Sequence, residues 1–332
     1  MKKEKKVLKG LTVIDLFSGI GGFHYAFKSF GAKIIYACEW DKDAASVYRD
    51  NFKLKPVGDI TKVDEKTVPD HNILCAGFPC QAFSISGKRL GFDDSRGTLF
   101  FDVARIVKEK QPQIVFLENV KNLVGHDGGK TFKVICNTMK ELGYDVNAKV
   151  LDSALFGSAQ KRERIYIVCF RKDLHVEDFC FPKPTSGGPY VKDILEPESP
   201  ALESFVVKRN DIVMNGKEGK ASDGPVRLGI VNKGGQGERI YSPEGKGITL
   251  SAYGGGAGAR TGLYLINGQI RKLTPRECAR LDGFPDSFRY APNKYTAYKQ
   301  FGNSVVIDVL QTIVEQICKC KNIQAWVDQV QK

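Results

Sequence analysis

The amino-acid sequence predicts an α/β fold in which helices cover both faces of a largely parallel sheet, followed by a smaller β-rich domain. Short apolar runs typical of buried strands recur through the first half of the chain, and segments with apolar residues at helical spacing separate them. Such alternation is typical of parallel sheets that are buried on both faces. At 181–189 (FPKPTSGGP) the alternation stops, and the residues that follow are rich in glycine.

The predicted elements of the first part alternate along the chain. We expect buried strands at 11–17, 34–38, 73–76, 114–117 and 165–170, and helices at 23–30, 41–51, 99–110 and 132–142. Asp41 is suited to cap the second helix, because its short side chain can accept from the first free backbone N–H groups.

The later part of the chain has two further helical signals. Thr274-Pro275-Arg276-Glu277 predicts a helix start in which Thr274 caps, Pro275 takes the first position and Glu277 completes a capping box. This helix should end at Gly283. The segment 304–320 has the pattern of a last helix, and 247–253 has that of a short strand.

The charge of the chain favours a polyanionic partner. Its 332 residues include 50 Lys and Arg against 38 Asp and Glu, a formal net charge of +12. A protein this basic usually binds nucleic acid, although the charge could serve solubility alone. The charged start and the short apolar runs predict neither a secretion signal nor a membrane span.

The nine cysteines indicate a reducing compartment. Their number is odd and no two have C-x-x-C spacing. We therefore expect no disulfide framework, no zinc or other metal site, and a cytoplasmic location.

A turn after the first predicted strand indicates a nucleotide-like ligand. Phe17-Ser18-Gly19-Ile20-Gly21-Gly22 leads into a helix, and such glycines let the backbone approach a ligand there. A dinucleotide fingerprint would need glycine where the chain has His24, so NAD is disfavoured. Glu39 could hold ribose hydroxyls, Trp40 offers a face for adenine, and Asp59 could accept from an amino group. A merely tight turn and a solvated strand end are the alternatives.

Chemically active side chains follow or begin three predicted strands. Cys80 lies in a turn after 73–76, and Glu118 follows 114–117. Arg162 and Arg164 could face one anion or carbonyl, since alternate residues of a strand share a face; a solvated strand edge is the alternative. In open α/β sheets, ligands bind at the carboxyl ends of strands. A thiolate, a carboxyl group and paired guanidinium groups are thus expected to converge on one ligand site.

Six motifs in order make the chain similar to a known family: DLFSGIGGF, GFPCQAFS, FLENV, QKRERIYIV, RECARLDGFP and QFGNSV. They resemble the motifs of DNA cytosine-5 methyltransferases over nearly the whole chain. The resemblance implies a Rossmann-like S-adenosylmethionine-dependent methyltransferase sheet and a β-rich target-recognition domain. It implies a catalytic and cofactor-binding domain at 1–192 and 303–332, target recognition at 193–274, and a hinge at 275–302.

The resemblance also implies roles for individual residues. Cys80 would add to C6 of a flipped-out cytosine, Glu118 would bond N3, and Arg162 and Arg164 would hold the cytosine carbonyl and a nearby phosphate. S-adenosyl-L-methionine would be bound by Phe17, Gly19, Ile20, Glu39, Trp40, Asp59, Ile60, Leu99 and Asn303. DNA would be contacted by Ser84, Ser86, Gln236, Arg239, Thr249, Tyr253, Gly254 and Gly255.

The segments VRLGIV, KGGQGERIYS and ITLSAYGGG carry a finer resemblance, to a family member that methylates the inner cytosine of GCGC. It implies double-stranded DNA as the partner and a monomeric bacterial or phage-encoded enzyme of a restriction-modification system, with a cognate endonuclease as a genetic partner. Two alternatives stay open. One is an RNA (tRNA) cytosine-5 methyltransferase on the same scaffold, and the other is a DNA-binding protein without catalysis.

Overall fold

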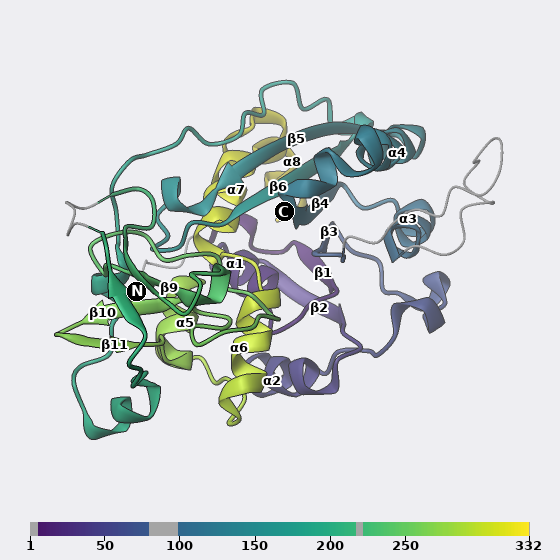
Figure 1. The fold of residues 1–332 in the computed structure, drawn as a ribbon. Coiled ribbons are helices and arrows are strands. Elements are labelled where there is room, and N and C mark those ends of the chain that lie inside the picture. Colours follow the sequence, from purple (N-terminus) through teal and green to yellow (C-terminus); the bar gives the residue numbers. More distant parts are fainter. Residues whose placement is uncertain (1–5, 80–98, 217–221, 332) are drawn as a thin grey trace. The chain divides into compact units, whose positions relative to one another are not determined.

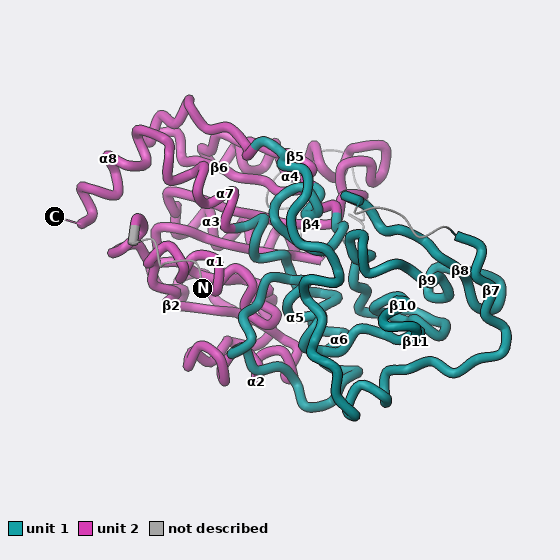
Figure 2. The backbone as a smooth tube through the Cα atoms, turned by 90° about the vertical axis from the view of Figure 1, so that its left-hand side faces the viewer, with its two compact units in different colours: residues 1, 152–162, 183–310 teal, residues 2–151, 163–182, 311–332 magenta. Residues whose placement is uncertain are grey.

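The computed structural model describes residues 6–79, 99–216 and 222–331 (Figure 1). Its chain forms two compact units, coloured separately in Figure 2. Residues 152–162 and 183–310 belong to unit 1. Residues 2–151, 163–182 and 311–332 belong to unit 2. Each unit is thus assembled from separate stretches of the sequence.

Unit 2 is built on a six-stranded sheet with the order β2-β1-β3-β4-β6-β5. Its strands are β1 (Thr12–Leu16), β2 (Lys33–Cys38), β3 (Ile73–Ala76), β4 (Ile114–Val120), β5 (Tyr144–Asp152) and β6 (Glu163–Arg171). The first four run parallel, and β6 pairs antiparallel with β4. The carboxyl ends of β1 to β4 therefore share one edge of the sheet.

Helices cover both faces of this sheet. They are α1 (Gly22–Lys28), α2 (Lys42–Phe52), α3 (Leu99–Lys110), α4 (Lys130–Glu141) and α8 (Lys321–Val330), and α7 (Ile307–Lys319) starts in unit 1 and continues into unit 2. On one face, Val115 and Leu117 pack in a buried cluster with α3 and α4. On the other, Phe116 contacts the rings of Phe23 and Phe27 in α1, with centroids 5.3 and 6.3 Å away. The predicted fold class is confirmed.

Unit 1 contains a five-stranded sheet with the order β11-β10-β9-β8-β7. Its strands are β7 (Ile212–Met214), β8 (Arg227–Val231), β9 (Arg239–Tyr241), β10 (Leu263–Ile266) and β11 (Gln269–Arg271), and its helices are α5 (Pro275–Leu281) and α6 (Lys294–Asn303). Val231, Ile240 and Leu263 form the small core of the sheet. The β-rich character predicted for this part of the sequence is present.

Local helix signals in the sequence agree with the structure. The Asp41 side chain accepts from the backbone N–H groups of Asp43 and Ala44, at 3.0 and 3.1 Å, and so caps α2. Thr274 and Glu277 form the predicted capping box at the start of α5. The compact units group 275–302 with the β-rich segment, whereas the functional division into target-recognition domain and hinge stays a prediction.

Other predicted elements were wrong or missed. The segment 247–253 is not a strand, because side chains bind its backbone: Leu250 donates to the Gln160 side chain at 3.0 Å. The predicted helix 304–320 starts later, at Ile307, and a further helix, α8, follows it. β5 and α6 were not predicted, and β4 extends to Val120 instead of ending at Leu117.

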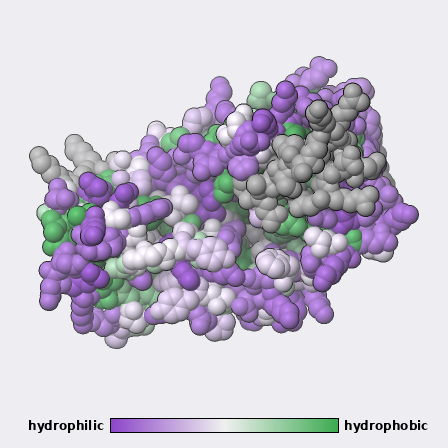
Figure 3. All heavy atoms as spheres, turned by 45° about the vertical axis from the view of Figure 1, so that its right-hand side comes forward, coloured by the Kyte–Doolittle hydropathy of each residue, from purple (hydrophilic) through white to green (hydrophobic). Residues whose placement is uncertain are grey.

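The described part of the chain contains no helix long and apolar enough to cross a membrane. Hydrophilic side chains predominate on the face drawn in Figure 3, with apolar groups exposed only in small patches between them.

Candidate active site

The glycine-rich turn after β1 adopts a backbone that requires glycine at two positions. Gly19 and Gly21 have φ angles of 53° and 95°. A Cβ atom on Gly21 would lie 2.1 Å from a ring carbon of Phe52, whereas one on Gly19 would have no heavy atom within 4 Å. The Phe52 ring therefore excludes a side chain at Gly21. At Gly19 the space beside the backbone is open.

His24 occupies the position where a dinucleotide fingerprint would have glycine. Its ring stacks on Phe52, with centroids 3.8 Å apart, and its Nδ1 lies 2.7 Å from the Tyr48 hydroxyl. Burial lowers the pKa of His24 from 6.5 to about 3, so the ring is neutral at pH 7. A buried aromatic cluster thus supports the turn from behind. Sequence analysis identified His24 as a departure from the dinucleotide motif but did not predict that its ring packs in this cluster.

Glu39 joins the turn to the end of β2. One carboxylate oxygen accepts from the Gly19 N–H and the other from the Asp41 N–H, both at 2.8 Å. Burial raises the pKa of Glu39 above its ordinary value, and these two N–H groups partly oppose that shift. Each carboxylate oxygen has a second lone pair. The group can therefore accept from ribose hydroxyls while it holds the turn.

The other predicted cofactor residues of unit 2 vary in exposure. Trp40 is 79% exposed and offers a free indole face, whereas Ile60 is buried. Asp59 accepts from the N–H and hydroxyl of Thr61, which lower its pKa. Phe17, Ile20 and Leu99 also belong to unit 2, with Ile20 buried and the other two packed against its core. Asn303 is the last residue of α6 and belongs to unit 1.

This set of side chains fits an adenosine-type ligand. A carboxylate at a strand end suits the ribose diol, an exposed indole face suits a purine ring, and the open space at Gly19 lets a ligand approach the backbone. The prediction of a nucleotide-like site depended on Gly19, Glu39 and Trp40. In the structure, Gly19 follows the carboxyl end of β1, and Glu39 and Trp40 follow that of β2.

Glu118 and Arg164 form an ion pair in unit 2. Arg164 Nε lies 3.2 Å from Glu118 Oε1, and the two side chains are only 15% and 9% exposed. Glu118 lies within β4, opposite Tyr166 of β6, so it does not follow the strand end as predicted. Arg164 lies opposite Val120, which places both side chains on one face of the sheet as diagonal neighbours. A carboxyl group and a guanidinium group, both shielded from water, can thus act on one ligand.

Asn119 connects this pair to the segment before the predicted nucleophile. Its Nδ2 donates to the Phe78 carbonyl at 2.7 Å, and its Oδ1 accepts from the Val120 N–H at 2.8 Å. Phe78 precedes Cys80 by two residues in the sequence. The backbone of Phe78 is therefore held at the strand that carries Glu118. The sequence analysis missed Asn119, although an amide directly after a candidate acid was a signal.

Cys80, Ser84 and Ser86 lie outside the described residues.

Arg162 has other partners than the sequence analysis expected. Its guanidinium donates to the carbonyl groups of Leu250, Gly302 and Ser304 at 2.7–3.0 Å, and the residue is 2% exposed. Arg162 also precedes β6 and belongs to unit 1, whereas Arg164 lies within β6 in unit 2. The expectation that both arginines face one anion or carbonyl is therefore wrong. Arg162 holds three backbone segments together.

Two of the predicted DNA-contacting segments lie side by side in unit 1. A Cβ on Gly237 would lie 2.0 Å from the Gly255 carbonyl oxygen, and the Gly258 N–H donates to the Gly237 carbonyl at 2.7 Å. The turn that carries Gln236 and Arg239 thus touches the glycine tract. The predicted contacts Gln236, Arg239, Thr249, Tyr253, Gly254 and Gly255 are all exposed.

These predicted contact residues are also anchored locally. Arg239 Nε donates to the Gly234 carbonyl at 3.3 Å, and the Thr249 hydroxyl donates to the Lys161 carbonyl at 2.7 Å. Tyr253 is 72% exposed, which is unusual for a large aromatic side chain without a partner to cover it. An exposed guanidinium and tyrosine beside a close-packed glycine backbone form a surface that a duplex could approach.

The chain is similar to known proteins over nearly its whole length. Residues 11–319 match the model of the C-5 cytosine-specific DNA methylase family. The chain is 59% identical over 322 residues to the type II methyltransferase M.HhaI of Haemophilus parahaemolyticus, covering 97% of this chain and 98% of that protein. It is 44% identical to the type II methyltransferase M1.ScrFI of Lactococcus lactis subsp. cremoris, covering 92% and 77%.

Solved structures show the same fold at low identity. DNMT2 of Spodoptera frugiperda superposes with a TM-score of 0.71 at 19% identity, covering 92% of this chain and 99% of that one. A DNA modification methyltransferase encoded within an Escherichia coli prophage gives 0.68 at 22% identity, covering 92% and 98%. On the family match and the long alignments to type II methyltransferases, the chain belongs to the C-5 cytosine-specific DNA methylase family and is an S-adenosyl-L-methionine-dependent DNA cytosine-5 methyltransferase.

Proposed function

We propose that this enzyme methylates C5 of the inner cytosine of GCGC in double-stranded DNA, through a covalent bond between Cys80 and C6 of a flipped-out base. One observation carries the proposal. The shielded Glu118–Arg164 pair lies on the strand whose Asn119 binds the backbone of Phe78, two residues before Cys80. A thiol, an acid and a cation are the groups that activation of a cytosine ring requires.

S-adenosyl-L-methionine supplies an electrophilic methyl group when it is bound. In the proposed site, Glu39 accepts from its ribose hydroxyls and Trp40 covers the adenine. Asp59 accepts from the adenine amino group, and Gly19 leaves room at the backbone. Phe17, Ile20, Ile60 and Leu99 provide apolar contacts, and Asn303 completes the set. The fit rests on the carboxylate at the strand end and the 79% exposed indole of Trp40.

Cytosine C5 is a weak nucleophile, and the proposed residues raise its electron density. The Cys80 thiolate adds its electron pair to C6, which breaks the C5–C6 double bond, while Glu118 donates a proton at N3 and Arg164 binds the O2 carbonyl. C5 of the enamine that results would form a bond to the methyl group, while the methyl–sulfur bond breaks and leaves its electron pair on the sulfur as a thioether. Removal of the C5 proton then returns an electron pair to the ring, expels the Cys80 thiolate from C6 and restores the C5–C6 double bond, and N3 returns its proton to Glu118. Arg162, which holds backbone carbonyls, is assigned a positioning role.

A cytosine stacked in a duplex cannot be attacked in this way, so the base must leave the helix. We assign the DNA contacts to Ser84, Ser86, Gln236, Arg239, Thr249, Tyr253, Gly254 and Gly255. The assignment of GCGC is supported by 59% identity over nearly the full length of M.HhaI. The enzyme would act as a monomer in the cytoplasm of a bacterium, with a restriction endonuclease of the same specificity as its genetic partner.

The proposed route is tested with a duplex in which the inner cytosine of GCGC carries fluorine at C5. Fluorine cannot leave as a proton does, so the covalent adduct should accumulate and appear on a denaturing gel when S-adenosyl-L-methionine is present. The Cys80→Ser variant should give no adduct, and a duplex with fluorine in the outer cytosine is the matched control. An active wild-type enzyme that forms no adduct would contradict the covalent route.

The target and the substrate class are tested separately. Bisulfite sequencing of DNA from cells that express the protein should show protection at the inner cytosine of GCGC alone. Methyl transfer to DNA and to tRNA should be compared at equal concentrations, because preferential transfer to tRNA would replace the DNA assignment.

A further inference from the structure

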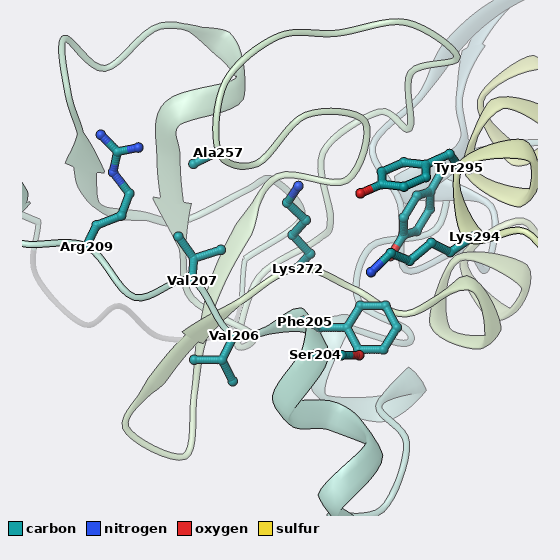
Figure 4. A pocket seen from close by; sticks show the side chains of 10 residues that line it. Ser204, Phe205, Val206, Val207, Arg209, Ala257, Lys272, Lys294 and Tyr295 are labelled. Carbon is teal, nitrogen blue, oxygen red and sulfur yellow. The ribbon is translucent and has the colours of Figure 1, made fainter.

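Unit 1 contains a cationic pocket apart from the residues assigned above (Figure 4). Its volume is about 260 Å³. The walls are formed by Ser204, Phe205, Val206, Val207, Arg209, Ala257, Lys272, Lys294, Tyr295 and Tyr298. Three of these residues are cations, and none of them is Asp or Glu. A pocket of this composition has a positive potential that a ligand of opposite charge would reduce.

Lys272 is the central cation of this pocket. It is only partly exposed, and the charged groups that act on it are both cations, Lys294 and Arg260. Burial first, and then these two charges, lower the pKa of Lys272 below its ordinary value. No hydrogen bond or ion pair joins its ammonium group to another side chain of the described residues. A half-buried ammonium group without a counter-ion is costly unless a ligand supplies one.

Lys294 is held in place by aromatic rings. Its Nζ lies 5.4 Å from the centroid of Phe205 and 5.6 Å from that of Tyr295. In Figure 4, Lys272 and Lys294 extend from different segments of the chain, and Phe205 and Tyr295 lie on either side of the Lys294 side chain. Like Lys272, Lys294 has no carboxylate partner among the residues described. The two ammonium groups could therefore share one anion.

The remaining cations differ from these two. Arg209 is paired with Asp211 at 2.6 Å, so its charge is already neutralised. Arg260 donates to the Tyr295 carbonyl and lies over the Tyr295 ring, 5.8 Å from its centroid. Arg260 therefore adds positive charge near Lys272 but does not line the pocket. Lys272 and Lys294 are accordingly the groups that a bound anion would meet.

We propose that this pocket is a phosphate-binding site in which Lys272 and Lys294 share one phosphate group. The phosphate belongs either to the DNA backbone or to a free nucleotide. The DNA backbone is favoured, because Ala257 in the wall belongs to the loop 254–260, whose glycines are the proposed DNA contacts. In that case the inference rests on the proposed function. The site would position the protein on the duplex but would not contribute to sequence recognition, because phosphate contacts carry no direct sequence information.

The first arm of the test measures the site without DNA or activity. The melting temperature of the wild type and of the double variant Lys272→Gln/Lys294→Gln is compared in inorganic phosphate and in chloride of equal ionic strength. The matched control is Lys183→Gln/Lys192→Gln, which removes two exposed charges of the same unit. Phosphate should raise the melting temperature of the wild type and of the control more than that of the pocket variant. Equal shifts in all three proteins would overturn the site.

The second arm identifies the source of the phosphate. Binding to a duplex without GCGC is measured over a salt series, in which one lost phosphate contact lowers the slope of log K against log salt by about 0.9. A decrease of about that size in the pocket variant, but not in the control, assigns the phosphate to DNA. An unchanged slope together with a positive first arm assigns it to a free nucleotide. A wild type that binds no DNA would refute the proposed function, while the first arm would still measure the pocket.

A variant that retains charge separates binding from folding. Lys272→Arg/Lys294→Arg should keep the phosphate-dependent rise in melting temperature. If the glutamine variant fails to fold, the arginine variant and the two single glutamine variants still report on the site. Loss of the response in the arginine variant with unchanged circular dichroism would show that positive charge is not what binds phosphate.

Discussion

The guanidinium of Arg164 and the carboxylate of Glu118 face each other across two antiparallel strands, 3.2 Å apart and nearly closed to water. Removal of either partner leaves a charge that is shielded from water and has no counter-ion, which costs on the order of 3–5 kcal/mol. We expect Glu118→Gln and Arg164→Gln each to lower the free energy of unfolding by that amount, and the double variant to lose less than their sum. Urea titration of the four proteins measures the coupling.

The Glu118→Gln variant should also have a lower rate of methyl transfer. Glu118→Gln cannot donate a proton at N3 and should reduce methyl transfer by roughly 10²–10⁴-fold. Additive losses of stability, together with normal turnover by Glu118→Gln, would contradict both the pairing and the catalytic role.

Arg162 offers a test of positioning against catalysis. A lysine carries its donors on one nitrogen and cannot reach three carbonyl groups with the planar fork of arginine. We expect Arg162→Lys to lower the free energy of unfolding by roughly 2–4 kcal/mol in the absence of DNA and cofactor, because carbonyls of Leu250, Gly302 and Ser304 lose their donors. A residue that only contacted substrate would leave this value unchanged. Calorimetry of the free protein makes the distinction.

Gly21 and Gly19 provide a matched pair of alanine substitutions. Both have positive φ, so each substitution should cost about 1–2 kcal/mol of backbone strain. Gly21→Ala also meets the Phe52 ring, and the overpacking should add about 1–3 kcal/mol. The combination Gly21→Ala/Phe52→Leu should recover part of that extra loss. Denaturant unfolding of the three variants tests this, and equal costs at the two glycines would show that the ring moves freely.

Arg239 is exposed at the start of β9 and is suited to a guanine of the target. Arginine donates to O6 and N7 of guanine, a contact that contributes about 1–3 kcal/mol of discrimination. Arg239→Ala should therefore raise the activation free energy for methylation of GCGC by about 1–3 kcal/mol. The rates at sites already altered at that guanine should change little. Rates on GCGC and its single-base variants measure this. A uniform loss over all sites would indicate a phosphate contact instead.

His71 should make stability depend on pH. The ring is buried and its Nδ1 lies 2.8 Å from the Pro69 carbonyl, to which the neutral ring donates. Burial lowers the pKa of His71 from 6.5 to about 4, reinforced by Lys110 and opposed by Pro69 and Asp70. Between these values the unfolded chain binds more protons than the folded one, so stability falls as the pH drops from 6.5 to 4.

This loss reaches roughly 3 kcal/mol at the lower end. The difference in unfolding free energy between the wild type and His71→Gln, measured across this range, should shrink as the pH falls. A constant difference would show that His71 does not titrate with a lowered pKa.

Several elements of both units could be predicted because their signals are local. The Asp41 cap, the Thr274–Glu277 box and the apolar runs of β1, β3 and β4 each depend on neighbours within a few residues. β5 was missed because its residues alternate irregularly between buried and exposed and include several polar side chains. The pattern of its sequence is therefore not that of a buried strand.

The partners of the site residues could not be predicted in the same way. Arg162 binds carbonyls 88, 140 and 142 residues further along the chain, and the sequence contains no sign of those distances. The R-x-R pattern predicted that both arginines face one ligand. It could not show that one faces a carboxylate while the other lies in another unit and holds the backbone.

The interleaving of unit 1 has a consequence for recombination between related enzymes. A crossover that transfers only 183–310 from a donor leaves 152–162 from the recipient, so Gln160 and Arg162 must fit foreign partners at Asp282, Leu250, Gly302 and Ser304. Hybrids that transfer both segments from one donor should fold, because each side chain then meets its own partners. Hybrids whose two segments come from different proteins should fold only where the donor backbone has carbonyl groups at the positions that Arg162 binds.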